Sequence, residues 1–341
     1  MPGAAQAMDF APAPAGPLTW PSPDAVVNGF VAADVGGNGN ADIVSIGQSN
    51  KIQVSLANDE GTAFTPAPGS PFGSGADDVE RHQVVAGEFG GDGAVDLVTV
   101  GTSPRKIETY IGDGTGTYAD TPDSMLIAPE TPDDGVIDTS TPPAVGRLNG
   151  DEYPDLVIGM EDHAYMVALG SASGQFTVTP QSDDGAVLPS EENSVGDTYA
   201  SPTLGDLNGD GKLDVAFVLR SPTEGEASSP GVYVAYGNGD GTFTPAANNP
   251  AFQSDAPLGT VARINLNGDA YADLSLTDPS YGEVITLLGG TTGPVEGESV
   301  SVVDPVAQAI GDLDQDGDED IATGLVPVSY THLTLPTNRE V

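Results

Sequence analysis

A nine-residue acidic pattern that recurs six times is the sequence feature that most constrains this chain of 341 residues. The copies begin at residues 34, 88, 147, 206, 265 and 312, so their starts lie 47 to 59 residues apart. Position 9 is Asp in every copy, and position 5 is Asp or Asn. Regular spacing over most of a chain indicates that one supersecondary unit is repeated.

Each copy of the pattern is surrounded by short runs that are typical of β-strands. Alternating apolar residues follow the acidic loop at 43–46, and a second run follows at 52–56. A glycine-rich turn that ends in an aromatic residue comes next, as at 237–243. No segment shows a helical periodicity of useful length. Four strands per repeat predict an all-β fold, a β-propeller built from four-stranded antiparallel blades.

The repeats divide the chain into three parts. Residues 28–326 contain the six visible repeats, and residues 1–27 form an Ala/Pro-rich N-terminal segment. Residues 327–341 contain no Gly and no Asp, and they resemble a translated vector tail. We therefore expect this tail to be non-native and the natural array to continue beyond it.

The acidic loop and the Gly-Asp-Gly-Thr-Phe turn together resemble the FG-GAP/VCBS repeat family, whose best-known members form the seven-bladed propeller of integrin α-subunits. The loop at 206–214 and the turn at 237–243 show both signatures. The resemblance implies a calcium-stabilised propeller that binds partners outside the cell. Six copies are visible where seven are usual, so we expect either a seven-bladed array truncated at the C-terminus or a smaller ring.

The chemistry of the loops independently predicts calcium. Ca²⁺ takes 6–8 oxygen ligands at about 2.3–2.6 Å. Positions 1, 3, 5 and 9 can supply carboxylate or amide oxygens, position 7 a main-chain carbonyl, and glycine at position 6 permits the bend. The bidentate Glu that an EF-hand places at position 12 is absent in all six copies. We therefore expect structural calcium in strand–loop–strand sites.

The six loops differ in their ligands. We expect the strongest sites at 206–214 and 312–320, and weaker ones in the first, second and fifth loops. In the third loop we expect Arg147 to replace the metal by pairing with Asp151 and Asp155. The alternative, that acidic loops only hydrate the surface, is favoured for that loop alone. The candidate metal positions are Asp206, Asn208, Asp210, Lys212, Asp214, Asp312, Asp314, Asp316, Asp318, Asp320, Asp34, Asn38, Asn40, Asp42, Glu88, Asp92, Asp96, Asn265, Asn267, Asp269 and Asp273.

Composition excludes several classes of protein. With 51 acidic and 9 basic residues, the formal charge is −42, which repels nucleic acid. No apolar run approaches the ~20 residues that span a bilayer. The chain has no cysteine, so it has no disulfide and no thiolate metal site. An acidic, lysine-poor composition is also typical of proteins from saline habitats.

The sequence contains no constellation typical of catalysis, so we expect a non-enzymatic protein. His82 and His163 lie in different repeats, and there is no Gly-x-Ser-x-Gly motif. Trp20 and Tyr199 could stack on a sugar, although packing roles are the more common use of such residues. The scattered basic residues argue against a lyase acting on uronates.

Three functions remain open from the sequence. The first is a calcium-stabilised binding or adhesion module that is extracellular, on the cell surface or periplasmic. The second is a lectin or a polysaccharide-active, lyase-type propeller, and the third is a structural spacer in a larger surface protein. Antiparallel blades place the acidic loops and the glycine-rich turns on one face. We expect a partner protein or a neutral glycan on the opposite face, which carries most of the long connections.

Overall fold

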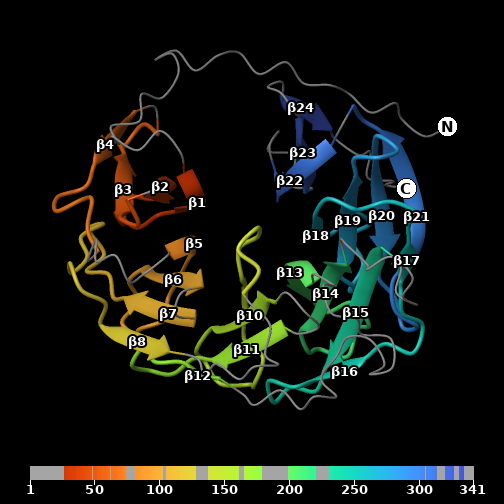
Figure 1. Cartoon of the computed structure of the whole chain (residues 1–341), viewed down its shortest axis with the longest axis horizontal. Coiled ribbons are helices and arrows are strands. Elements are labelled where there is room, and N and C mark those ends of the chain that lie inside the picture. The colour runs from red at the N-terminus through yellow and green to blue at the C-terminus, as the bar shows by residue number, and fades with distance from the viewer. Residues whose placement is uncertain are drawn as a thin grey trace. The chain divides into compact units, whose positions relative to one another are not determined.

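The computed structural model describes residues 27–47, 49–61, 63–73, 81–102, 105–127, 137–160, 165–178, 199–219, 230–303, 305–312, 319–325 and 330–333. Every regular element in this part of the chain is a β-strand, and the strands form six antiparallel sheets (Figure 1). One sheet corresponds to each acidic repeat. The chain divides into two compact units, with three sheets in each.

The N-terminal unit contains three four-stranded sheets whose strands follow one another in chain order. In each of them the acidic loop joins the first strand to the second, and the second strand begins at the Asp in position 9. The strands are β1 (Val27–Ala33), β2 (Asp42–Gly47), β3 (Ile52–Ala57) and β4 (Phe64–Pro66); β5 (Arg81–Gly87), β6 (Asp96–Thr102), β7 (Arg105–Tyr110) and β8 (Ser124–Ile127); and β9 (Ala144–Gly146), β10 (Asp155–Gly159), β11 (Tyr165–Leu169) and β12 (Thr177–Val178).

The C-terminal unit repeats this plan with two departures from the expected four strands. Its strands are β13 (Tyr199–Gly205), β14 (Asp214–Leu219), β15 (Gly231–Gly237), β16 (Phe243–Pro245) and β17 (Phe252–Gln253); β18 (Val261–Ile264), β19 (Asp273–Asp278), β20 (Glu283–Leu288) and β21 (Val295–Ser301); and β22 (Pro305–Gly311), β23 (Asp320–Leu325) and β24 (Tyr330–Leu333). The last described sheet thus has three strands. Its third strand, β24, belongs to residues 327–341, the tail that we expected to be non-native.

The extra strand β17 extends the outer edge of the fourth sheet. Both β16 and β17 pair with β15, and the side chain of Asn249 fills the gap between them. Its Oδ1 accepts the N–H of Val234 at 2.9 Å, and its Nδ2 donates to the Val234 carbonyl at 2.8 Å. The Asn249 side chain thus makes the two hydrogen bonds that a strand residue would make with its main chain. The chain then continues along the same edge of the sheet as β17.

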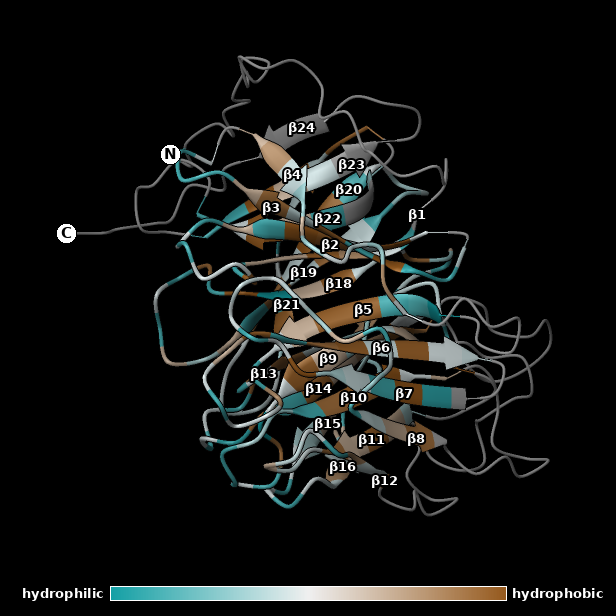
Figure 2. Cartoon of the chain, turned by 90° about the vertical axis from the view of Figure 1, so that its left-hand side faces the viewer, coloured by the Kyte–Doolittle hydropathy of each residue, from teal (hydrophilic) through white to brown (hydrophobic). Residues whose placement is uncertain are grey.

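The hydrophobic core lies between neighbouring sheets. The strands carry most of the apolar residues, and the turns that join them are polar (Figure 2). All six residues of β14 and all six of β19 are buried, because both faces of a middle strand are covered. One apolar cluster joins the first and second sheets, and another joins the fourth and fifth. Within each unit, these clusters stabilise the neighbouring sheets that they join.

A buried ion pair adds a polar connection between the first and second sheets. Arg81 on β5 has no exposed surface, and its Nε donates to Glu108 Oε2 at 2.6 Å. Its other nitrogens donate to the Asn50 carbonyl at 2.7 Å and to the Tyr110 hydroxyl at 3.0 Å. Burial, together with the negative charge of Glu108, raises the pKa of Tyr110. The guanidinium therefore holds the turn between β2 and β3 against β5 and β7.

Replacing Arg81 by Met should lower the free energy of unfolding by roughly 3–5 kcal/mol, because Glu108 would remain charged, buried and unpaired. Adding Glu108→Gln to Arg81→Met should recover part of this loss, since the amide carries no charge. Urea denaturation followed by circular dichroism measures both differences. Equal stability of the wild type and the Arg81→Met variant would contradict the assigned role of the pair.

Candidate metal centres in the acidic loops

The Asp at position 9 connects two parts of each sheet in the five completely described loops. Its side chain is fully buried in all five. One carboxylate oxygen accepts main-chain N–H groups from position 2 or 3 of the loop, and the other accepts the N–H of the residue at or just after the end of the third strand. These hydrogen bonds measure 2.6 to 2.9 Å, and they join Asp42 to Gly36 and Ala57, Asp96 to Phe89, Gly90 and Gly112, Asp155 to Leu148 and Gly170, Asp214 to Leu207 and Gly237, and Asp273 to Leu266 and Gly289.

The residue that donates from the third strand is glycine in four of these five loops. A Cβ at Gly112, Gly170, Gly237 or Gly289 would lie only 2.1 to 2.3 Å from the carbonyl oxygen of loop position 8. No real Cβ tolerates that distance from a main-chain oxygen. The glycine that opens the turn after the third strand is therefore needed so that this strand can approach the acidic loop.

A second glycine, at position 4, shapes the loop itself. Gly37, Gly91, Gly150, Gly209 and Gly268 all have positive φ angles, between 66° and 80°. This conformation lets the side chains at positions 3 and 5 accept N–H groups two residues further on, as Asn208 does from Asp210 at 2.8 Å. From the sequence we predicted a role only for the glycine at position 6, not for the one at position 4. Its presence in five of the six copies was the available signal.

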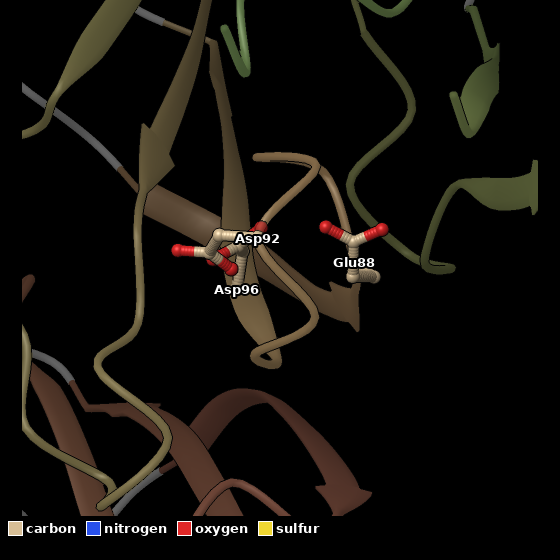
Figure 3. Close-up of side chains that lie close together, drawn as sticks. All are labelled: Glu88, Asp92 and Asp96. Carbon is tan, nitrogen blue, oxygen red and sulfur yellow. The ribbon is translucent and has the colours of Figure 1, made fainter. Parts of the chain in front are cut away.

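The second loop brings three carboxylates together. Glu88, Asp92 and Asp96 each offer an oxygen within 4.8 Å of the others (Figure 3). In the described part of the chain this is the one group of three or more acidic or histidine side chains that meets this distance. All the donors are oxygens, which is the ligand type that Ca²⁺ prefers. These residues therefore fit a calcium ion, although position 3 of this loop is Gly90 and we expected stronger sites elsewhere.

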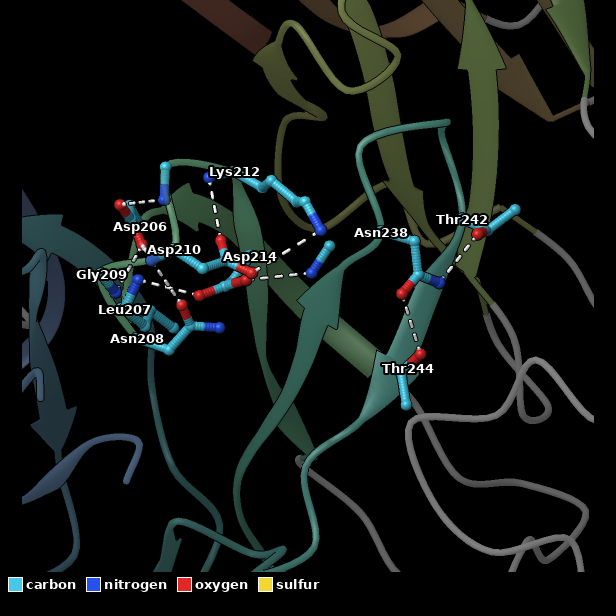
Figure 4. Close-up of polar contacts among 12 residues, drawn as sticks. Asp206, Leu207, Asn208, Gly209, Asp210, Lys212, Asp214, Asn238, Thr242 and Thr244 are labelled. Atoms are coloured by element: carbon cyan, nitrogen blue, oxygen red, sulfur yellow. Dashed lines mark hydrogen bonds and ion pairs between the residues drawn. The ribbon is translucent and has the colours of Figure 1, made fainter. Parts of the chain in front are cut away.

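The fourth loop carries its carboxylates in a more open arrangement (Figure 4). Both oxygens of Asp206 accept N–H groups of the loop, from Gly209 at 2.7 Å and from Gly211 at 2.9 Å. Asp210 lies 3.8 Å from the Lys212 ammonium. Burial, reinforced by the charges of Asp210 and Asp206, raises the pKa of Asp214 to about 6 despite its amide hydrogen bonds. A divalent cation in this loop would remove that repulsion.

In the other loops, hydrogen bonds hold several predicted ligands. In the first loop Asp34 accepts the N–H groups of Asn38 and Gly39, and the Asn40 side chain donates to carbonyls of the β3–β4 turn. In the fifth loop the Asn267 amide donates to Asp269 at 2.9 Å. In the sixth loop, Asp320 is buried at the start of β23. Asp312 is the last described residue before residues 313–318, which the structure does not describe. The remaining predicted positions of that loop, Asp314, Asp316 and Asp318, lie outside the described residues.

The predicted pairing of Arg147 in the third loop is wrong. Arg147 is exposed, and the described residues show no ion pair between it and Asp151 or Asp155. Asp155 is fully buried, and its oxygens instead accept the main-chain N–H groups described above. Asp151 instead accepts the Asn149 amide at 2.8 Å. This contact repeats the one in the fifth loop, so an Asn at position 3 can satisfy the carboxylate at position 5.

One acidic residue that joins two loops was not predicted from the sequence. Glu319, at position 8 of the sixth loop, accepts the N–H of Asn265 at 2.7 Å and pairs with Arg263 at 2.9 Å. Of the residues considered for catalysis or stacking, His82 contacts the Thr102 hydroxyl at 3.3 Å. His163, Trp20 and the side chain of Tyr199 lie outside the described residues.

Without calcium, the protein should lose stability as the pH rises from 4 to 7. Burial raises the pKa of Asp214 from its ordinary value of 3.8 to about 6, so the folded chain holds this proton more tightly than the unfolded chain. The resulting stability is fully present below about pH 4 and is lost as the pH rises through about 6. Burial also raises the pKa of Asp96, Asp155 and Asp273, which acts in the same direction.

Urea midpoints in chelator at pH 4, 5, 6 and 7 measure this dependence. Asp214→Asn should reduce the slope, because the amide does not titrate, whereas the exposed control Glu298→Gln should not. An unchanged slope in Asp214→Asn would show that this carboxyl does not carry the effect.

Comparisons with known proteins identify one repeat and a shared fold. Residues 147–217 match the family model of the FG-GAP-like repeat, and no curated protein matches the chain significantly. The structure of BBS1N in complex with ARL6DN is similar, with 13% identity and a TM-score of 0.55 over 96% of this chain and 82% of that one. An α-L-arabinanase of Penicillium chrysogenum, complexed with arabinobiose, has 12% identity and a TM-score of 0.54 over 91% of this chain and 93% of that one.

At such identities the likeness concerns the fold alone. No helix in the described residues is long and apolar enough to cross a membrane. The described part of the chain is therefore all-β and has the β-propeller fold, and residues 147–217 match the FG-GAP-like repeat.

Proposed function

We propose that this protein is a calcium-stabilised β-propeller that serves as a non-catalytic binding module. The observation that carries the calcium part is the convergence of Glu88, Asp92 and Asp96, whose oxygens lie within 4.8 Å of one another. Asp96 Oδ2 accepts two main-chain N–H groups, whereas Oδ1 accepts only that of Gly112 and keeps a second lone pair for a metal. Glu88 and Asp92 are less buried and would complete the site with water.

The role that we propose for calcium is structural. Carboxylates gathered at one point repel one another, and the raised pKa of Asp96 reflects burial together with the charge of Asp92. A cation that binds only the folded chain stabilises it by mass action, by about 2.7 kcal/mol per site at a concentration 100 times its Kd. Extracellular calcium modules bind at about 10⁻⁴–10⁻³ M, which suits a protein outside the cell, on its surface or in the periplasm.

The binding part of the proposal rests on the arrangement of the turns. The acidic loops and the turns between third and fourth strands lie at one end of each antiparallel sheet, where metal would make them rigid. The turns at the other end are free to contact a partner, which we propose to be a protein or a neutral glycan. A structural spacer is the alternative, and a glycan array probed with and without calcium separates the two. Formation of an unsaturated sugar product would indicate a lyase instead.

Calcium should raise the melting temperature of the wild type, and a chelator should lower it at low NaCl concentration. Titration calorimetry should show about one site fewer in the Glu88→Gln/Asp92→Asn variant than in the wild type, because the second loop would lose two ligands. The exposed control Asp120→Asn should bind as the wild type does. A melting temperature that the chelator leaves unchanged at low salt would contradict structural calcium.

A further inference from the structure

Two adjoining cavities lie at the end of the fifth sheet that is opposite its acidic loop. They have volumes of about 450 and 370 Å³, and Tyr281 in the β19–β20 turn lines both of them. The larger cavity is lined by residues of β17 in the fourth sheet and of β20 and β21 in the fifth, all within the C-terminal unit. We call the two cavities together the Tyr281 groove. Its size is in the range of small-molecule sites.

The groove has an apolar component. Phe252 and Ile285 line the larger cavity, and Val302 and Val303 line the smaller one. Ile285 and Val302 are buried in the core and Phe252 is half-buried, so the apolar surface open to a ligand comes mainly from Tyr281 and Val303, which are 62% and 72% exposed. An aromatic ring and alkyl groups can hold the hydrocarbon part of a ligand.

The polar lining of the larger cavity is acidic. Asp255, Glu283 and Glu296 contribute carboxylates that are not buried, and no Lys, Arg or His lines either cavity. Asp278 also lines the larger cavity, but its carboxylate is buried and accepts hydrogen bonds from Ser254, Ser280 and Tyr281. Among the described residues, none of the four forms an ion pair with a basic side chain. The groove therefore offers negative charge that only a ligand would compensate.

Hydrogen bonds fix the turn that carries Tyr281. Asp278 is 1% exposed, and its Oδ1 accepts the N–H groups of Ser280 at 3.0 Å and Tyr281 at 3.2 Å. Gly282 has a φ of 65°, and its carbonyl accepts the N–H of Val302 at 2.7 Å. A Cβ at Gly282 would lie 2.9 Å from the Val302 carbonyl oxygen. The tyrosine is thus placed before any ligand arrives, which reduces the entropy lost on binding.

We propose that the Tyr281 groove binds a linear organic cation of the alkyl polyamine class. Methylene groups would contact Tyr281, Val303 and the exposed part of Phe252, and ammonium groups would lie among the carboxylates of Asp255, Glu283 and Glu296. The face of the Tyr281 ring attracts a cation, and Tyr is a suitable partner for an alkylammonium group. A neutral sugar would leave these three carboxylates without a counter-charge, so the charge of the groove favours the cation. This site goes beyond the proposed structural role of calcium.

Titration calorimetry with spermidine tests the proposal in 150 mM NaCl and saturating calcium, which keeps the probe from occupying the acidic loops. The wild type should show one saturable site. Tyr281→Ala should weaken binding by about 2- to 30-fold, whereas Tyr281→Phe, which keeps the ring, should bind as the wild type does. Glu283→Gln/Glu296→Gln should weaken binding about ten-fold or more.

The control variant is Glu298→Gln, which removes the same charge from β21 at a residue that does not line the groove. It should weaken binding less than two-fold. If Glu298→Gln weakens binding as much as Glu283→Gln alone, the polyamine is attracted only by the net charge and the proposal is wrong. It is equally wrong if Tyr281→Ala binds spermidine normally, or if a neutral disaccharide binds in a Tyr281-dependent manner and spermidine does not. Circular dichroism establishes that each variant is folded.

Discussion

The buried carboxylate at position 9 is the interaction on which the rest of each sheet depends. It lies where three chain segments meet: the start of the acidic loop, the start of the second strand and the end of the third. Main-chain N–H groups in a tight loop have no ladder partner, and an unpaired buried N–H costs about 1–3 kcal/mol. One aspartate satisfies two or three of them, as Asp96 does for Phe89, Gly90 and Gly112. The position-9 carboxylate therefore stabilises the acidic loop even without a metal.

These hydrogen bonds change what a calcium ion would contribute to the loop. The carboxylate that organises the loop is also the one whose charge is least favourable, because burial raises the pKa of Asp96 and Asp214. The loop geometry is set by hydrogen bonds and glycines, so a metal would not need to assemble it. It would instead neutralise carboxylates that the main chain already holds in place. Such a site gives stability through linkage rather than through a large change of structure.

Much of the fold could be predicted from the sequence, because the repeat fixes the period and alternating residues fix the strands. The second strand begins at position 9 in all six sheets, as at Asp42 and Asp320. The sequence did not predict features that depend on contacts between residues far apart in the chain. The Asn249 side chain that continues an edge into β17 has no periodic signal, and neither does the contact between Glu319 and Asn265. Arg147 was misjudged because sequence spacing does not show that Asp155 is buried beneath its own loop.

The fifth sheet carries carboxylates at both ends, but in two different arrangements. In the acidic loop at one end, Asp269 and Asp273 accept main-chain N–H groups of one tight turn, an arrangement that suits a small ion of high charge. At the other end, Glu283 and Glu296 line an elongated groove beside the exposed ring of Tyr281. A point charge would leave that ring in water, whereas the long organic cation that we propose would cover it and meet several carboxylates at once. The distribution of apolar surface therefore distinguishes the two kinds of cation that we propose for a chain of net charge −42.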